Sequence, residues 1–463
     1  MDCSNNNVKL IAMYLPQYHP IPENDAWWGK GFTEWTNVRK AEPRFPGHYQ
    51  PHVPGQLGYY DLRDASARQA QAELAREYGI HGFCYYHYWF NGKRLLETPF
   101  NQVLKSGEPD FPFCLCWANE NWTRRWDGRD QDMLMEQHYS DQDSLDFIND
   151  LIPAFSDKRY IRVNAKPLLL VYRTSLLPDP KKTANIWREA MVRAGIGEIY
   201  LVRVEHGLDG SEPHPGDIGF DAAMEFAPNW KNCGNRVVDL EQIGQPQHPV
   251  DENLLVFNYD ECMANMLGRP KPAYKRFRGV FPAWDNSARK QDSLLFVNST
   301  PEKYEHWLNA TVHYTRNNFD HGEQLVFVNA WNEWGEGCHL EPDQRYGLGY
   351  LEATRQVLLS VMDYRPLVSE GRRFIAADNA EGSLWLERVS ALLAAKEESL
   401  VDKYRDPRHP LLKELELKDL QLVAKDKELE DKDRVLRALY ASLTWRVTAP
   451  LRRLLDKVLP KKQ

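Results

Sequence analysis

The chain has 463 residues, of which 42% are hydrophobic and 27% are charged. This composition can supply a sizeable core and excludes wholesale disorder. The 58 basic and 66 acidic residues give a net charge of −8, which argues against a nucleic-acid binder over the whole chain. No apolar run approaches the roughly 18–20 residues of a membrane-spanning helix.

The cysteine pattern and the N-terminal residues bear on the cellular compartment of the protein. The seven cysteines include no CxxC pair, which predicts a reduced protein without structural zinc. The segment Met1 to Asn7 has neither a basic region nor an apolar run. The sequence therefore predicts no signal peptide and a cytoplasmic location.

Short apolar and aromatic runs alternate along the chain with amphipathic stretches. The runs predict strands over Leu10–Leu15, Gly82–Tyr88, Phe113–Trp117, Pro167–Tyr172, Ile199–Val204, Ala222–Phe226, Gly279–Ala283 and Leu325–Asn329. Helices are predicted over Ala65–Tyr78, Asp143–Phe155, Thr183–Ala194, Pro301–Thr315 and Tyr350–Met362. This alternation predicts an α/β protein, a (β/α)8 TIM-type barrel with long loops over residues 1–362. A doubly wound sheet is the alternative, but neither a GxGxxG nor a GxxxxGK[ST] motif is present.

Polar and aromatic residues follow the predicted strands. The ends of barrel strands converge on one face, so these residues are expected to line one cleft, although a large aromatic core is the alternative. Aromatic rings with Asn, His and carboxylates suit a carbohydrate, whose C–H faces stack on rings while its hydroxyls form hydrogen bonds. The candidate substrate-binding residues are Tyr14, Gln17, His19, Trp35, His87, Tyr88, Trp89, Trp117, Asn119, Glu120, Trp122, Trp284, Asp285, Asn329, Trp331, Asn332, Trp334 and His339.

Glu333 and Glu336 are the candidate catalytic residues. They lie three residues apart after the last predicted strand, next to Trp331 and Trp334. Reactions at glycosidic bonds commonly use two carboxyl groups, one that protonates the departing oxygen and one that acts on the opposite face. Burial against the indoles would raise one pKa and keep that carboxyl group protonated.

Longer motifs in the same places resemble the WbsX-type glycosyltransferase family. They are residues 15–24 (LPQYHPIPEN), 29–38 (GKGFTEWTNV), 84–90 (CYYHYWF), 114–123 (CLCWANENWT), 329–334 (NAWNEW) and 339–343 (HLEPD). The resemblance runs from about Lys9 to Leu358, and this family is itself similar to the endo-α-mannosidase barrels of glycoside hydrolase family 99. It implies a (β/α)8 fold and chemistry without a metal or other cofactor.

The resemblance also implies roles for the two glutamates. In those hydrolases the first Glu of the pair acts as base on the sugar 2-hydroxyl, and the second acts as general acid and base. Carried over, Glu333 is the base and Glu336 the acid. Here Trp334 and Gly335 stand between them, where the hydrolases have Trp-His.

Three functions stay open from the sequence. The family is typically associated with O-antigen and capsule enzymes, which favours a glycosyltransferase of cell-surface polysaccharide or lipopolysaccharide biosynthesis, with a lipid-linked glycan and an activated sugar donor as partners. The alternative is an endo-acting retaining glycoside hydrolase, and the third possibility is a glycan-binding protein without catalysis. Two DxD patterns, at residues 130–132 and 141–143, match the metal-binding motif of nucleotide-sugar enzymes in their residue letters, but no other feature of that fold accompanies them.

Four histidines follow predicted strands, and we expect them to donate hydrogen bonds rather than bind a metal. They have neither HxH nor HExxH spacing. They are His19, His87, His206 and His339.

The composition changes after Met362. Residues 363–410 are predicted as a linker with a short helix, and residues 411–443 as a charged helix in which Leu recurs every seven residues from Leu415 to Leu443. That segment is either a solvated single helix or a weak coiled coil that mediates self-association. Residues 444–463 predict a basic amphipathic helix that contacts the inner face of the cytoplasmic membrane, or alternatively packs on the barrel or on a second copy.

Overall fold

The structure is a computed structural model that describes residues 8–124, 129–208, 212–243 and 247–363. The chain divides into two units, Met1–Tyr364 and Arg365–Gln463. The predictions for the linker after residue 363, the Leu-repeat helix and the basic tail lie outside the described residues. Within the described residues, no helix is both long enough and apolar enough to cross a membrane.

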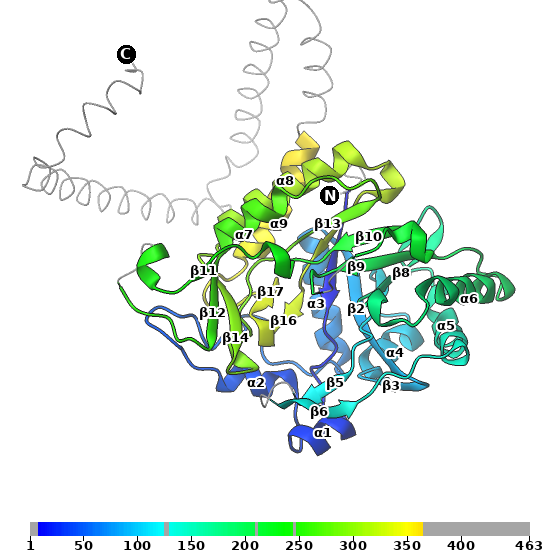
Figure 1. The fold of residues 1–463 in the computed structure, drawn as a ribbon, viewed down its shortest axis with the longest axis horizontal. Helices are drawn as coiled ribbons and strands as arrows, with labels where there is room; N and C mark the ends of the chain where they lie inside the picture. Colours follow the sequence, from blue (N-terminus) through cyan, green and yellow to red (C-terminus); the bar gives the residue numbers. More distant parts are fainter. Residues whose placement is uncertain (1–7, 125–128, 209–211, 244–246, 364–463) are drawn as a thin grey trace, which may run out of the picture. The chain divides into compact units, whose positions relative to one another are not determined.

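Eight parallel strands form a closed barrel (Figure 1). In order around the barrel they are β1 (Lys9–Tyr14), β2 (Ile80–Phe90), β4 (Phe113–Trp117), β8 (Lys166–Val171), β9 (Tyr200–Glu205), β10 (Ala222–Glu225), β13 (Arg276–Val280) and β15 (Leu325–Val328). The barrel closes because β1 pairs with both β2 and β15. All eight predicted strands are confirmed, and so is the (β/α)8 class.

The β13 strand begins three residues before its predicted start. Its sequence, RFRGV, carries two charged residues, and this masks the apolar pattern of a strand. Both arginines are nevertheless buried, because Arg276 pairs with Glu205 and Arg278 pairs with Glu225. Ion pairs to the neighbouring strand β10 and to β9, the next strand beyond it, thus replace the apolar packing that the prediction relied on.

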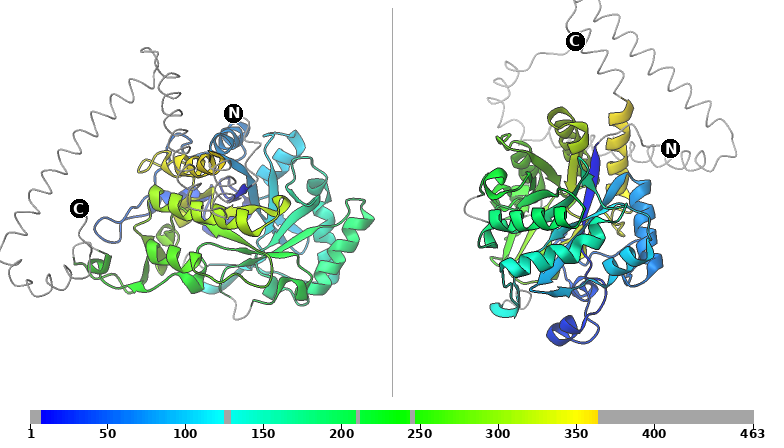
Figure 2. Two further views of the ribbon diagram at one scale, coloured as in Figure 1. Left: turned by 90° about the horizontal axis from the view of Figure 1, so that it is seen from above. Right: turned by 90° about the vertical axis from the view of Figure 1, so that its right-hand side faces the viewer.

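Helices surround the barrel, as Figure 2 shows from two further directions. They are α3 (Ala65–Glu77), α4 (Thr98–Ser106), α5 (Asp141–Phe155), α6 (Pro180–Arg193), α7 (Tyr259–Leu267), α8 (Pro301–Asn318) and α9 (Gly349–Asp363). The five predicted helices are confirmed as α3, α5, α6, α8 and α9. Four of them begin after a capping side chain whose oxygen accepts a backbone N–H: Asp64, Ser140, Asp179 and Thr300.

Short elements inserted after the strands build a rim at one end of the barrel. Helices α1 (Pro22–Trp28) and α2 (Glu34–Lys40) follow β1, and the hairpin of β5 (Trp122–Arg124) and β6 (Arg129–Met135) follows β4. They lie together below the barrel in Figure 1. A small sheet contains β11 (Arg236–Val237), β12 (Leu254–Asn258) and β14 (Ser293–Val297), and β16 (Asn332–Glu333) pairs with β17 (Cys338–His339). The sequence did not predict these strands: β11, β16 and β17 have only two residues each, and β12 and β14 lie in a separate sheet outside the alternation of barrel strands and helices.

Candidate active site

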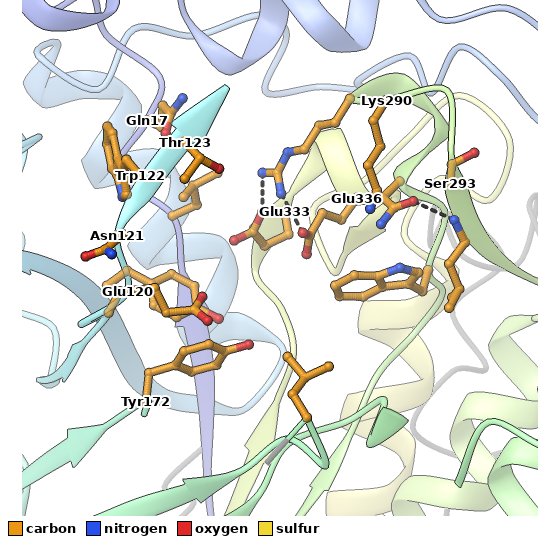
Figure 3. Close-up of a pocket in the computed structure, with 18 of the residues that line it drawn as sticks. Gln17, Glu120, Asn121, Trp122, Thr123, Tyr172, Lys290, Ser293, Glu333 and Glu336 are labelled. Carbon is orange, nitrogen blue, oxygen red and sulfur yellow. Dashed lines mark hydrogen bonds and ion pairs between the residues drawn. The ribbon is translucent and has the colours of Figure 1, made fainter. Parts of the chain in front are cut away.

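A cavity of about 470 Å³ opens at the carboxyl ends of the barrel strands (Figure 3). Residues at the end of every barrel strand contribute to its wall, which is where (β/α)8 enzymes hold their active sites. Examples are Gln17, Tyr88, Glu120, Tyr172, Leu208, Phe226, Trp284 and Glu333.

Glu333 and Glu336 both line this cavity. Glu333 belongs to β16, and a single 3-10 turn over Trp334–Glu336 carries the chain to Glu336. Gly337 ends the turn in the left-handed region at φ 56, a conformation that favours glycine. The Asp285 N–H donates to the Glu336 carbonyl oxygen at 2.6 Å and so fixes the turn against the β13 end.

Arg289 joins three carboxylates in what we call the carboxylate cluster: Glu34, Arg289, Glu333 and Glu336. The guanidinium Nε lies 2.7 Å from Glu34, one terminal nitrogen lies 2.7 Å from Glu333, and the other lies 2.5 Å from Glu336. In Figure 3 Glu333 and Glu336 lie side by side, and dashed lines mark their ion pairs. Neither Arg289 nor Glu34 is among the predicted site residues.

One guanidinium cannot balance three buried carboxylates. Burial raises the pKa of Glu336 to about 8, and the charge of Glu333 adds to this effect, although Arg289 opposes it. The pKa of Glu333 is also raised, again mainly by burial. Glu336 therefore holds a proton at neutral pH, and its side chain is the more exposed of the two, at 21% against 7%.

Gly335 makes the cluster possible. A Cβ atom at this position would lie 1.8 Å from Glu34 Oε1 and 2.8 Å from Arg289 Nε. Any side chain here would displace the guanidinium or the Glu34 carboxylate. This explains a glycine between Trp334 and Glu336.

Trp334 is held in place by a second buried carboxylate. Its indole N–H donates to Glu341 at 2.6 Å, and its ring stacks on His339 with centroids 3.7 Å apart. Glu341 also accepts from Tyr60 at 2.7 Å and from Gln71 at 2.6 Å. Its pKa is raised to about 7 by burial, and these donors partly offset that rise. The network fixes the residue between the two cavity glutamates.

Five of the predicted substrate-binding residues line the cavity: Gln17, Tyr88, Glu120, Trp122 and Trp284. The aromatic wall also includes Trp28 and Trp230, which sequence reasoning did not select. Trp28 lies in α1, and Trp230 follows β10 and packs edge-on against Trp284 at 5.2 Å. A clustering of Trp at strand ends was the signal that could have identified Trp230.

Several polar atoms in the wall find no hydrogen-bond partner among the described residues. They are Gln17 Nε2, both amide atoms of Asn24 and Trp284 Nε1. Buried polar groups are rarely left unpaired in proteins, because each one costs free energy. These unpaired atoms belong to buried side chains that line the cavity.

All three predicted asparagines bind backbone instead: Asn329 donates to the Ala227 carbonyl at 2.9 Å, and the other two each accept and donate across adjacent strands. Asn332 accepts from the Leu15 N–H at 2.8 Å and donates to the Leu15 carbonyl at 3.0 Å. Asn119 does the same with Arg173, accepting and donating at 2.8 Å. Each of these last two amides ties the ends of two adjacent barrel strands together.

Other predicted residues lie in the core, away from the cavity wall. Trp117 stacks on Phe147 of α5 with centroids 4.3 Å apart, and Trp89 donates to Asp143 at 2.7 Å. Trp117 and Trp89 therefore belong to the aromatic core, which was the alternative to a position in the cleft. Also buried outside the cavity wall are Tyr14, His19, Trp35, His87, Asn329 and Trp331.

Asp285 and His339 line a neighbouring cavity rather than this one. Asp285 accepts from His48 at 2.7 Å and from Gln50 at 2.8 Å. These contacts join the end of β13 to the segment that follows α2.

The barrel with an acidic, aromatic cavity at its strand ends defines a carbohydrate-active enzyme. Residues 10–354 match the family model described as Glycosyltransferase WbsX, and the chain belongs to this family. It is 47% identical over 355 residues to the "Uncharacterized protein WxcX" of two Xanthomonas campestris pv. campestris strains, B100 and ATCC 33913. The match covers 76% of this chain and 50% of each relative, so the chain spans about half of their length.

Solved structures of low sequence similarity also align with the chain. The GH99 endo-alpha-mannosidase from Bacteroides thetaiotaomicron aligns over 77% of this chain and 98% of its own, with 14% identity and a TM-score of 0.49. A "Glycoside hydrolase-like protein" aligns over 76% of this chain and 94% of its own, with 14% identity and a TM-score of 0.48.

Proposed function

We propose that the protein is a glycosyltransferase that acts in assembly of a cell-surface polysaccharide, such as O-antigen or capsule, on the cytoplasmic side of the membrane. Its substrate is a lipid-linked glycan. Membership of the WbsX family supports this assignment. The aromatic wall and the unpaired polar atoms of the cavity support a sugar ligand.

The observation that carries the proposal is the carboxylate cluster. Glu336 is protonated at neutral pH and is exposed to the cavity, so it can donate a proton to a departing sugar oxygen. Glu333 is held at the same guanidinium, at 2.7 Å, and serves as the base. A single arginine thus positions the acid and the base together.

The reaction follows from these roles and from the resemblance to glycoside hydrolase family 99. Glu336 protonates the glycosidic oxygen while the bond from C1 to that oxygen breaks. Glu333 takes the proton of the 2-hydroxyl, whose oxygen closes on C1 as an epoxide. The Glu336 carboxylate then takes a proton from the acceptor hydroxyl, which attacks C1, and Glu333 returns its proton to O2.

The wall is positioned to orient the sugar. The amides of Gln17 and Asn24 and the indole N–H of Trp284 would exchange hydrogen bonds with sugar hydroxyls, because they have no partner among the described residues. Trp122 and Tyr88, whose rings lie 5.1 Å apart, offer a face for the apolar side of a ring.

A second candidate is an endo-acting retaining glycoside hydrolase, in which water replaces the acceptor hydroxyl. The protonated Glu336 fits this candidate as well as it fits transfer from a glycoside, because a sugar hydroxyl needs a proton to depart whereas a nucleotide phosphate does not. The lining cations are Arg289, already bound to three carboxylates, and Lys290. A transferase of this design would thus take its glycosyl group from a glycoside.

Product analysis separates the two. Full-length protein is incubated with lipid-linked oligosaccharides extracted from a polysaccharide-producing bacterium, with and without nucleotide sugars, and products are identified by mass spectrometry. Elongated glycans, with or without shortened ones, support the transferase, and shortened glycans without any elongated product support the hydrolase. If wild type and the Glu336→Gln variant both leave every glycan unchanged, neither assignment stands.

A further inference from the structure

A second cavity, of about 420 Å³, lies beside the first, and Trp284 lines both. Its wall comes from the segment after α2, from the connection between β14 and α8, and from the chain after β17. It includes His52, His339 and Asp343, which are 6%, 4% and 5% exposed. One ligand atom of each residue lies within 4.8 Å of the other two.

Hydrogen bonds orient the His339 imidazole. Its Nδ1 lies 2.9 Å from the Glu341 carbonyl oxygen, which can only accept, so Nδ1 carries the proton. The Nε2 atom therefore presents a lone pair, and it lies 2.9 Å from His52 Nδ1. An imidazole that donates one N–H to a backbone carbonyl and presents the other nitrogen is the usual arrangement of a metal-ligating histidine.

The Asp343 carboxylate is oriented in the same way. One oxygen accepts from the Tyr49 hydroxyl at 3.1 Å, and the other accepts from the Tyr346 N–H at 2.6 Å. Each oxygen of a carboxylate has two lone pairs, so both keep the capacity to bind a cation. Outer hydrogen bonds of this kind hold ligating carboxylates in place.

We propose that His52, His339 and Asp343 bind a divalent transition-metal ion, with Zn²⁺ as the best match. Two imidazoles and one carboxylate with an open fourth position form a recurrent zinc site, and the cavity has room for a water molecule there. On binding, the His52 proton moves from Nδ1 to Nε2, so Nδ1 becomes a ligand and no net proton is released. The two nitrogens must separate slightly from 2.9 Å, because zinc–nitrogen bonds of about 2.0–2.1 Å hold tetrahedral ligands farther apart.

The ion would act on the neighbouring active site as a structural support. It would tie the segment after α2 to β17, and His339 stacks on Trp334, which stands between Glu333 and Glu336. One charge opposes binding: the Arg345 guanidinium lies over the Tyr49 and Tyr346 rings at 4.7 and 5.1 Å. Arg345 is exposed, so water screens its charge.

The test uses the full chain without an affinity tag, stripped with a chelator and then titrated with Zn²⁺ by calorimetry and with Co²⁺ by visible absorption. We expect one ion per chain, the intense d–d bands of four-coordinate Co²⁺, and a Tm that rises by a few degrees. The variants His52→Gln, His339→Gln and Asp343→Asn should each lose at least about tenfold in affinity, because loss of an outer partner of a ligand already costs about 10–100-fold. His138→Gln, at an exposed side chain, is the matched control and should bind as wild type does.

Wild-type protein that takes up neither ion at one equivalent would overturn the proposal, whatever the variants do. Uptake that is equal in wild type and in folded His52→Gln and His339→Gln variants would overturn it as well. Circular dichroism checks that each variant is folded. Because the readout is metal binding and not turnover, the result is independent of the proposed glycosyl transfer.

Discussion

The barrel contains two buried charge clusters that differ in the balance of their charges. The carboxylate cluster has three carboxylates around one guanidinium. An arginine cluster at the ends of β9 and β10 has the opposite composition, with two carboxylates and four guanidinium groups. Its members are Arg203, Glu205, Glu225, Arg269, Arg276 and Arg278.

The difference separates Glu336, which we propose as the acid, from carboxyl groups that form structural ion pairs. Glu205 and Glu225 are as buried as Glu333, but each contacts at least two guanidinium groups, at distances from 2.6 to 3.7 Å. Excess positive charge stabilises ionised carboxylates. In the carboxylate cluster the single cation is outnumbered, so a proton is retained on Glu336. Burial is the main cause of the raised pKa of Glu336, and the small number of cations in its cluster leaves that rise incompletely opposed.

The largest effects are expected when one glutamate of each cluster is replaced by glutamine. Glu336→Gln should lower kcat by about 10²–10⁴ while Tm stays near that of wild type, because it removes the proton donor. Glu225→Gln should keep kcat within a few fold and lower the free energy of unfolding by about 3–5 kcal/mol, because it removes the carboxylate that pairs with the buried Arg278. Turnover assays and urea denaturation measure both variants. A Glu336→Gln enzyme with wild-type turnover would remove this residue from the mechanism.

Gly335→Ala should have the next largest effect on activity. Its Cβ would meet Glu34 Oε1 at 1.8 Å and push the cluster apart. A misplacement of about 1 Å costs roughly 10² in rate, and we expect that loss in kcat/KM. Gly268→Ala, whose nearest contact is 3.2 Å, is the matched control at the end of α7 and should leave kcat/KM unchanged. Equal activity in the two variants would show that the geometry of the cluster is not required.

The pH dependence follows from the same imbalance. Glu336 has to be protonated to act as an acid, so kcat/KM should fall about tenfold for each pH unit above about 8. Its pKa is raised on folding from 4.5, so the folded state binds the extra proton. The free energy of unfolding should therefore decrease as pH rises from about 4.5 to about 8, and Glu336→Gln should abolish that part of the decrease. A basic limb that persists unchanged in a partly active Glu336→Gln enzyme would assign it to another group.

The sequence predicted the barrel and the pair Glu333 and Glu336, but not the groups that set their charge. Strand periodicity and the Trp-rich motif are local signals, and both survive in the structure. Glu34 belongs to α2 and Arg289 follows the turn after β13, so only the closed barrel brings them together. An asparagine after a strand looks the same in the sequence whether its amide binds a ligand or a neighbouring backbone. Asn119 and Asn332 bind backbone, and the sequence alone could not show this.

The smallest expected effect separates a cavity tryptophan from a core tryptophan. Trp122 lines the cavity on β5 and is half-buried, whereas Trp117, at the end of β4, is 1% exposed. Stacking on an aromatic face is worth about 0.5–1.5 kcal/mol, so Trp122→Ala should raise KM by about 2–12-fold with kcat and Tm nearly unchanged. Trp117→Ala should instead lower the free energy of unfolding by about 3–5 kcal/mol, because it leaves a space beside Phe147. The KM of the folded enzyme should stay unchanged.

Acrylamide quenching of tryptophan fluorescence gives an independent measurement. Bound glycan should protect part of the emission of the wild-type protein from acrylamide, and should protect less of the emission of Trp122→Phe. If saturating glycan protects the same emission in both proteins, Trp122 does not contact the sugar, and the aromatic wall on that side of the cavity serves packing alone.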